Sequence, residues 1–360
     1  MKAPHVVVVG GSAGALPGLL EIARHLPLDF PAAVLVVVHL SPDHPSRLPE
    51  LINSAGPLEA RSAQGGEILQ AGCIYVAPPD QHLLVQGETL QLSRGPRENR
   101  ARPSIDVLFR SAAYARAPAV TGVLLSGMLD DGTSGLWTIK QLGGHATVQH
   151  PEEAEYPSIP LSAVQRVEID DILPAREIGP QLVRQLGQAA AQPGSGHAER
   201  QTMNDHERRR LELELRVAGE DNAFEGGILN LGAMSPFTCP ECHGVMVKLE
   251  EGHAIRFRCH TGHAFTPAAL LSELRESVEA TLWTSVRALD ENVMLLDHLT
   301  KHFSEAGDPI QGQLFRQEAA TVRERSRTVR GVALQAGQHP PESLPHAARS
   351  GEEAAGKRSG

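Results

Sequence analysis

Short apolar runs and amphipathic stretches alternate along the first half of the chain. The runs that predict buried strands lie at residues 5–9, 33–38, 73–76, 120–125 and 146–149. The stretches between them repeat apolar residues at helical spacing and predict helices at 15–26, 46–54, 104–116 and 134–142. Strands that alternate with helices pair in parallel through right-handed crossovers. The expected fold class is therefore α/β, a doubly wound and mostly parallel sheet with a β-hairpin insertion at 82–93.

The second half has a different composition and a different period. Gln, Pro, Gly, Ser and His replace periodic apolar residues at 189–206, which predicts a linker. Leucine and valine later recur at helical spacing from 271 to 296, and a second helix is expected at 311–330. These helices are expected to form a hairpin or coiled coil, and self-association through them stays open. The predicted domains are a first domain at 1–188, a linker with a helix in it at 189–234, a Cys/His segment at 235–268, a helical region at 269–335 and a disordered tail at 336–360.

Composition narrows the classes of function. The chain has 360 residues and a formal net charge of −10 without a long basic run, which argues against a nucleic-acid binder. No run approaches the ~18 uninterrupted apolar residues of a membrane span, and the first apolar run lacks a cleavage signal. Three of the four cysteines have metal-ligand spacing. A reducing, cytoplasmic setting is therefore expected.

Residues 10–14 form the pattern G-x-S-x-G with Ser12 at its centre. The pattern follows a predicted strand and precedes a predicted helix, the setting in which a tight turn exposes a serine hydroxyl. By itself it fits equally well a glycine loop that cradles a phosphate at a helix N-terminus. A nucleophilic serine needs a histidine base and a carboxylate that orients this histidine. The choice between these interpretations therefore depends on partner residues.

Two further strand ends supply candidate partners. His39 ends the second predicted strand and Asp131 follows the 120–125 strand, so a parallel sheet would bring both to the edge where Ser12 lies. Each also has a structural interpretation, His39 as a strand cap and Asp131 as a turn or N-cap residue. Asp130 competes with Asp131, because spacing cannot rank adjacent acids. Other candidates are expected in surface or turn positions: His44, His82, His145, His150 and Asp170–Asp171.

A second candidate site has the spacing C-x2-C-x16-C-x3-H, formed by Cys239, Cys242, Cys259 and His263. Two such knuckles meet around one tetrahedral ion, and thiolates with an imidazole favour zinc. Because four protein ligands leave no open position, the zinc is expected to be structural. Reduced thiols are the alternative, and His243 and His260 are reserve ligands. The helix that follows is acidic and leucine-striped, which favours a protein partner over DNA.

Five motifs resemble the CheB-type protein-glutamate methylesterase family over residues 4–185. They are VVVGGSAG (7–14), VVVHLS (36–41), YVAPPDQH (75–82), RPSID (102–106) and LSGMLDDG (125–132). The resemblance implies that Ser12 is the nucleophile, His39 the base and Asp131 the orienting acid. It also implies that Met128 lies near the oxyanion site. The chain order Ser, His, Asp differs from that of α/β-hydrolases, in which the acid precedes the histidine.

The resemblance further implies a reaction and a partner. The enzyme would hydrolyse glutamate methyl esters on methylated chemoreceptors or receptor-like signalling proteins and release methanol without a catalytic cofactor. Deamidation of glutamine is open by the same route. Backbone amides near Ala13 and Met128 would stabilise the oxyanion. A general serine carboxylesterase and a catalytically silent signalling or binding module are the alternatives.

The sequence departs from the family pattern at two places. Many members have Ser-Thr-Gly-Gly at the nucleophile, where residues 12–15 here are Ser-Ala-Gly-Ala. A hydroxyl contact from the second position is missing, so the rate or the substrate preference is expected to differ. Better-known members also carry an N-terminal phosphoreceiver domain, whereas here the first strand is predicted within a few residues of Met1. Phosphorylation in cis is therefore not expected.

Overall fold

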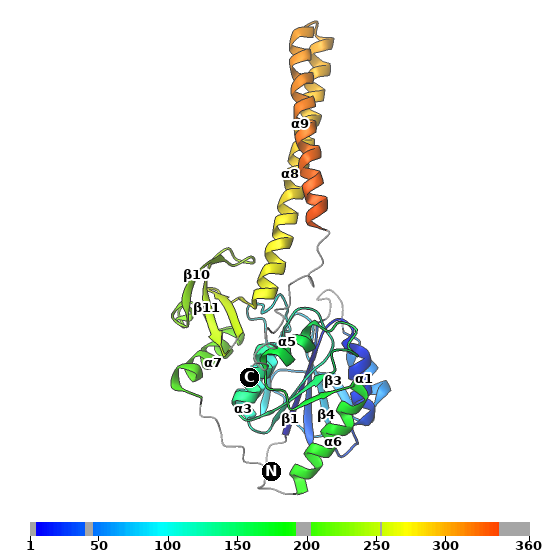
Figure 1. Cartoon of the computed structure of the whole chain (residues 1–360), viewed down its shortest axis with the longest axis vertical. Coiled ribbons are helices and arrows are strands. Elements are labelled where there is room, and N and C mark those ends of the chain that lie inside the picture. Colours follow the sequence, from blue (N-terminus) through cyan, green and yellow to red (C-terminus); the bar gives the residue numbers. More distant parts are fainter. Residues whose placement is uncertain (1–4, 40–45, 192–202, 253, 338–360) are drawn as a thin grey trace, which may run out of the picture. The chain divides into compact units, whose positions relative to one another are not determined.

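Seven parallel strands form the central sheet (Figure 1). The computed structural model describes residues 5–39, 46–191, 203–252 and 254–337. In spatial order the strands are β3 (Glu59–Ser62), β4 (Cys73–Val76), β2 (Ala32–Val38), β1 (His5–Gly11), β7 (Val120–Leu124), β8 (His145–Gln149) and β9 (Asp171–Leu173). From β1 the chain places β2, β3 and β4 on one side and then β7, β8 and β9 on the other, so the topological switch point lies between β1 and β7. The predicted α/β, doubly wound fold class is confirmed.

Helices cover both faces of this sheet because its strands are apolar on both faces. Val6 and Val8 of β1 belong to one buried core, and Val7 and Val9 belong to the other, as alternating side chains require. The helices on the first face are α3 (Ile105–Arg116), α4 (Thr133–Gln141) and α5 (Ser158–Arg166), and those on the second are α1 (Ala15–His25), α2 (Leu48–Ala55) and α6 (Ala175–Ala191).

The elements β3, β9, α5 and α6 are not among those that the apolar pattern predicts. Both strands are short and carry charged residues, so no apolar run marks them. Asp170 and Asp171 were expected in a surface turn, but Asp171 begins β9. Lys140 Nζ lies 2.7 Å from Asp170 Oδ1, and His145 Nε2 lies 2.8 Å from Asp171 Oδ2. These ion pairs hold the two acids against the edge of the sheet.

The predicted hairpin insertion is present as β5 (His82–Gln86) and β6 (Thr89–Ser93). It forms a two-stranded sheet of its own that packs on α3. A helix inside the predicted linker, α7 (Asp205–Ala218), packs on α3, and its Ala218 joins Leu84 of the hairpin and Val107 of α3 in a small buried cluster. The linker region therefore contains a helix that belongs to the same body as the parallel sheet.

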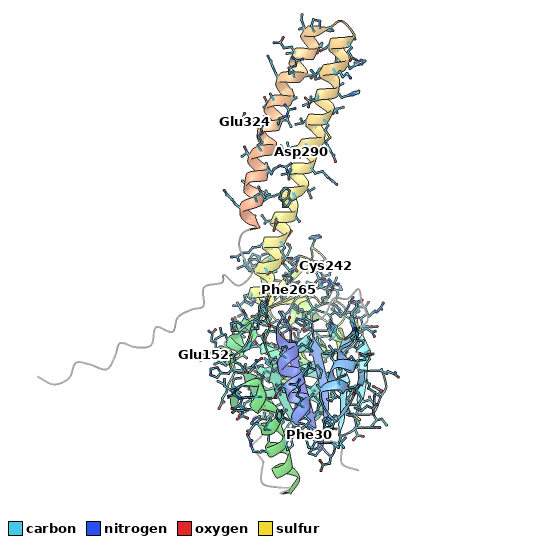
Figure 2. All side chains as sticks on the ribbon, turned by 90° about the vertical axis from the view of Figure 1, so that its right-hand side faces the viewer. Phe30, Glu152, Cys242, Phe265, Asp290 and Glu324 are labelled. Atoms are coloured by element: carbon cyan, nitrogen blue, oxygen red, sulfur yellow. The ribbon has the colours of Figure 1, made fainter. Side chains whose placement is uncertain are left out.

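The Cys/His segment folds as a four-stranded antiparallel sheet. Its strands, in order, are β10 (Ala233–Thr238), β11 (Val245–Glu251), β12 (Ala254–Cys259) and β13 (Ala264–Phe265), and a short 3-10 helix, η1 (Ile228–Asn230), precedes them. Phe257 and Phe265 pack with Leu270 in a small core beside the cysteines, and Phe265 is labelled in Figure 2. So small a core cannot stabilise a sheet alone, so the segment needs further anchors.

Buried ion pairs connect this antiparallel sheet to α3 and α7. Glu98 lies between Arg110 of α3 and Arg258 of β12, and both guanidiniums contact its carboxylate. Glu214 of α7 binds Arg256 of β12 through both oxygens, at 2.7 and 2.8 Å. All five side chains are almost inaccessible to solvent. Since a buried charge that loses its partner is costly, these pairs hold the three elements together.

The chain divides into two compact units, Met1–Glu273 and Leu274–Gly360. The helix α8 (Pro267–Glu305) begins in the first unit and forms most of the second together with α9 (Pro309–Ala336). In the described ranges, no helix combines the length and the hydropathy that a membrane crossing requires. The predictions of a linker, a disordered tail and a surface position for His44 lie partly or wholly outside the described residues, because 192–202, 338–360 and His44 are not described.

The second unit is a helical hairpin in which α8 and α9 lie side by side (Figures 1 and 2). Val293 and Leu296 of α8 pack against Val322 of α9. Asp290 of α8, labelled in Figure 2, lies 2.6 Å from Arg330 of α9. Both predicted C-terminal helices are therefore present and pair with each other.

We expect Glu98→Gln to lower the free energy of unfolding by about 3–5 kcal/mol, because it removes the buried carboxylate that the guanidiniums of Arg110 and Arg258 share. Asp290→Asn, which removes a solvent-exposed ion pair, is the matched control and should cost less than about 1 kcal/mol. Equilibrium urea unfolding measures both. Equal effects of the two substitutions would show that the buried pairs do not anchor the Cys/His sheet.

Candidate active site and Cys/His cluster

Ser12 follows β1 in a turn that backbone hydrogen bonds hold on both sides. Its N–H donates to the Ser126 carbonyl at 2.9 Å, and its own carbonyl accepts from Ala15 N at 3.1 Å. Gly14 closes the turn in the left-handed region, at φ 71°. A Cβ at this position would lie 2.7 Å from Ser126 Oγ and 2.8 Å from Glu155 Cβ. Glycine is therefore required by both conformation and space, and the turn sets Ser12 at the carboxyl edge of the sheet.

His39 lies beside Ser12 because their strands are hydrogen-bonded neighbours. The register of β1 and β2 pairs Gly11 with Val38, and His39 N donates to the Gly11 carbonyl at 3.2 Å. The side chain of His39 is 22% exposed, and its Nε2 lies 2.8 Å from Asp131 Oδ2. Asp131 therefore fixes the imidazole through Nε2, and Nδ1 is the nitrogen on the other side of the ring.

Asp131 is buried, with 2% of its surface exposed, and donors surround it. Besides His39, the groups that face its oxygens are Asn99 Nδ2 at 3.0 Å, Ser104 Oγ at 2.9 Å, Ile105 N at 2.7 Å and Asp106 N at 3.3 Å. Burial by itself would raise the pKa of Asp131, but the hydrogen bond and charge of His39, with the bonds from Asn99 and Ile105, lower it to about 2. The two amides begin α3, whose dipole also favours a negative charge. Asp131 therefore stays ionised.

Asp130 points to a different set of partners. Thr266 Oγ1 donates to its Oδ1 at 2.5 Å, and Arg166 lies 3.3 Å from its Oδ2. Spacing could not rank the two adjacent acids, whereas their contacts differ. Of the two, Asp131 is the one that contacts His39.

Asp106 forms a buried carboxyl pair with Asp131. Its Oδ1 accepts from Gly135 N at 2.6 Å, and its Oδ2 accepts from Asn99 Nδ2 at 2.9 Å. Burial, followed by the negative charge of Asp131, raises the pKa of Asp106 to about 8, against the opposing charge of Arg110. Near neutral pH one carboxyl of the pair is ionised and the other is mostly protonated.

His82 does not lie in a surface or turn position, as the sequence suggested, but is fully buried in β5. Its Nε2 lies 3.0 Å from the Pro96 carbonyl and therefore carries the proton, and its Nδ1 accepts from Ser104 N at 3.2 Å. Burial lowers the pKa of His82, so the ring is neutral. The neutral ring fixes Ser104, whose hydroxyl donates to Asp131. Two of the family motifs could have indicated this contact between His82 and Ser104: the motif at 75–82 ends at His82, and the motif at 102–106 contains Ser104.

The segment that carries Met128 packs directly on Ser12. A Cβ on Gly127 would lie 2.8 Å from Ser12 Cβ. Ser126 Oγ donates to the Ala13 carbonyl at 2.9 Å and so ties this segment to the turn after β1. In the described part of the chain, the amides of Ala13 and Met128 donate to no protein acceptor. Both amides are therefore available near Ser12.

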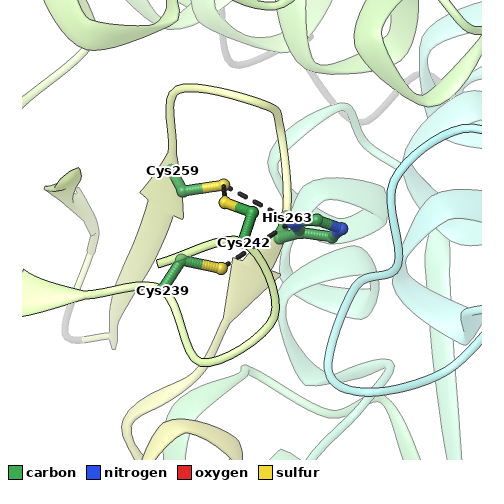
Figure 3. Close-up of side chains that lie close together, drawn as sticks. All are labelled: Cys239, Cys242, Cys259 and His263. Carbon is green, nitrogen blue, oxygen red and sulfur yellow. Dashed lines mark hydrogen bonds between the residues drawn. The ribbon is translucent and has the colours of Figure 1, made fainter. Parts of the chain in front are cut away.

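The Cys/His cluster brings its four predicted ligands together (Figure 3). The ligand atoms of Cys239, Cys242, Cys259 and His263 all lie within 4.8 Å of one another. Cys242 Sγ lies 3.6 Å from Cys259 Sγ, and His263 Nδ1 lies 3.6 Å from Cys259 Sγ and 3.7 Å from Cys239 Sγ. A tetrahedral ion with Zn–S bonds of about 2.3 Å has ligand separations of about 3.8 Å. The cluster therefore fits one small tetrahedral ion.

The surroundings of the cluster also suit a metal site. Glu241 lies 3.2 Å from His263 Nε2, the ring nitrogen that points away from the sulfurs. Carboxylates commonly orient metal-ligating histidines in this way. The reserve ligands His243 and His260 are not part of the group of four found among the described residues.

The parallel sheet and its polar strand ends define an α/β protein with Ser, His and Asp at the topological switch point. Residues 7–182 match the family model described as CheB methylesterase. A putative protein-glutamate methylesterase/protein-glutamine glutaminase of Leptospira interrogans is 34% identical over 179 residues, which cover 49% of this chain and 93% of that relative. The chain therefore belongs to the CheB methylesterase family.

Other relatives match the same half of the chain. A protein-glutamate methylesterase/protein-glutamine glutaminase 2 of Anaeromyxobacter dehalogenans is 36% identical, and the match covers 50% of this chain and 53% of that relative. The crystal structure of the Thermotoga maritima CheB methylesterase catalytic domain is 31% identical, with a TM-score of 0.49, and the match covers 51% of this chain and 98% of that one. The family match thus ends before α7 and the Cys/His sheet.

We expect the stability of the protein to fall between about pH 4 and pH 8, because unfolded Asp106 loses its proton there while the folded form keeps it until about pH 8. The slope from this one group is at most about 1.4 kcal/mol per pH unit. Asp106→Asn lacks the titration, so its free energy of unfolding should improve relative to the native protein as pH rises. Urea titrations at pH 5, 6.5 and 8 test this, and parallel pH dependences would contradict the assignment.

Proposed function

We propose that this chain is a protein-glutamate methylesterase that hydrolyses glutamate 5-O-methyl esters on methylated chemoreceptors or receptor-like signalling proteins. Ser12 is the nucleophile, His39 the base and Asp131 the acid that orients His39. The observation that carries the proposal is the contact of His39 with an ionised, buried Asp131 beside Ser12, inside a CheB methylesterase family domain. The names of the relatives support the ester and the glutamine amide as substrates.

In the first half of the reaction, Ser12 Oγ attacks the γ-carbonyl carbon while His39 Nδ1 takes the hydroxyl proton. Asp131 holds the opposite ring nitrogen, so the imidazolium that forms is stabilised. The amides of Ala13 and Met128 donate to the oxyanion. The tetrahedral intermediate then expels methanol, which receives its proton from His39, and a glutamyl ester of Ser12 remains.

In the second half, water attacks this glutamyl ester with His39 again as the base. The bond to Ser12 Oγ breaks, Ser12 regains its proton, and a free glutamate remains on the receptor. A glutamine side chain follows the same steps with ammonia as the leaving group. No step needs a catalytic cofactor.

A zinc ion held by Cys239, Cys242, Cys259 and His263 has a structural role in this enzyme. Three thiolates and one imidazole are a ligand set that zinc prefers, and four protein ligands leave no position for substrate. The described cysteines are all free thiols, which suits a cytoplasmic enzyme. Self-association through α8 and α9 stays a prediction.

The first experiment is release of labelled methanol from methylated chemoreceptor membranes. The intact protein should release it, and Ser12→Ala and His39→Ala should lower kcat by about 10⁴-fold or more, because a triad acts as a unit. Circular dichroism checks that both variants are folded.

The two acids give a sharper comparison. Asp131→Asn should lower kcat by about 10³–10⁴-fold, because it favours the wrong imidazole tautomer, whereas Asp130→Asn should retain far more activity. Similar losses in two folded variants would refute the choice of Asp131. Turnover of free esters with no release from receptor would point to a general serine carboxylesterase, and an intact protein inert towards both would be a binding module.

The metal proposal has its own test. Purified protein should contain about one zinc per chain, and Cys259→Ala should lose it and melt at a lower temperature, because ligand binding stabilises the small antiparallel sheet. Cys73→Ala, a change of the same chemistry outside the cluster, is the control. Zinc content and thermal melts that respond equally to both substitutions would exclude the site.

A further inference from the structure

The segment of residues 97–100 is an added edge of the Cys/His sheet. Asn99 N donates to the Ala264 carbonyl at 2.8 Å, and Ala264 N donates to the Arg97 carbonyl at 3.2 Å. Glu98 accordingly forms a parallel β-bridge with Ala264 of β13. The position of this segment is therefore set by the Cys/His sheet as well as by the parallel sheet.

The side chain of Asn99 bridges the Cys/His sheet and the carboxyl pair. Its Oδ1 accepts from Thr266 N at 2.9 Å, whereas its Nδ2 donates to Asp131 Oδ1 at 3.0 Å and to Asp106 Oδ2 at 2.9 Å. Both ends of the amide are thus occupied, which fixes its orientation. Asn99 is buried and has φ 50°, a left-handed conformation that asparagine tolerates better than most residues.

Thr266 makes a second contact with the same acidic turn. Its hydroxyl donates to Asp130 Oδ1 at 2.5 Å and accepts from Ala269 N at 3.1 Å, so it also caps α8. Thr266 therefore touches Asp130 through its side chain and reaches Asp131 through Asn99.

The residues on either side of Asn99 are anchored to elements that follow β10. Glu98 contacts Arg258 of β12, and Arg100 donates to Ser272 of α8 at 2.8 Å. Three consecutive residues thus each contact the Cys/His sheet or the start of α8. Displacement of the Asn99 backbone would therefore require the contacts of its two neighbours to shift.

We propose that Asn99 and Thr266 are positioning residues for the catalytic acid Asp131. Through them, the Cys/His sheet contributes to esterase activity. The proposal rests on the proposed function, because it assigns the two residues a role in that reaction. They act through Asp131 and the turn that carries it, not on the substrate. Loss of either contact should therefore lower kcat and leave KM unchanged.

The experiment compares Thr266→Val, which keeps the shape and removes the hydroxyl, with Thr266→Ser, which restores the hydroxyl. Thr238→Val is the matched control, because Thr238 is exposed at the end of β10 in the same sheet. Asn99→Ala removes the bridging amide itself. The rate of Ser12 labelling by a fluorophosphonate, kcat and KM for methanol release, zinc content and circular dichroism are measured for each full-length variant.

We expect labelling and kcat to fall on the order of tenfold in Thr266→Val and further in Asn99→Ala, as the loss of hydrogen bonds to buried carboxylates implies. Thr266→Ser and Thr238→Val should match the native protein, with zinc content and KM unchanged throughout.

Native labelling rates in Thr266→Val and Asn99→Ala would overturn the inference alone. Slow labelling that follows lost zinc or lost folding, and that Thr266→Ser does not rescue, would also overturn it. A native protein with neither Ser12 labelling nor methanol release would overturn the proposed function together with the inference.

Discussion

The solvation of one buried carboxylate, Asp131, is the constraint on which the arrangement of the site depends. A charge that is removed from water must be compensated by donors, or the group takes up a proton. The donors come from separate parts of the chain: the end of β2, the 97–100 segment and the first turn of α3. Strand order places the first donor, and the third is placed by the packing of Ile105 of α3 on β1. The second is hydrogen-bonded to the Cys/His sheet.

The same constraint accounts for the unequal carboxyl pair. Asp106 and Asp131 share the Asn99 amide, so two negative charges there would repel at short range. Asp131 has His39 as an additional partner, which keeps the charge on Asp131. Burial, followed by that charge, raises the pKa of Asp106 to about 8.

The strand ends of the site could be predicted from the sequence because local rules determine them. An apolar run followed by a polar residue marks a strand end, and parallel pairing brings such ends to one edge. The supporting residues follow no such rule. Thr266 and Asp130 are hydrogen-bonded although they are 136 positions apart in the chain. Arg258 lies in a strand, and its buried guanidinium pairs with Glu98, which is also distant in the sequence. Charged residues are normally predicted at the surface, so a buried ion pair leaves no mark in a single sequence.

A strand of two residues, β13, cannot hold Thr266 in place by its own hydrogen bonds. His263, a proposed zinc ligand, lies three positions before Thr266, a distance of at most about 11 Å along an extended chain. A bound ion would fix one end of this short segment, and the N-terminus of α8 holds the other, so Thr266 would be restricted to a small volume. Hydrogen bonds weaken when their donor and acceptor move apart by a few tenths of an ångström. A Thr266 held in one position therefore supports the Asp130–Asp131 turn better than a residue of a mobile loop would. The proposed zinc would thus act on the site through the position of Thr266, without contact with the reacting groups.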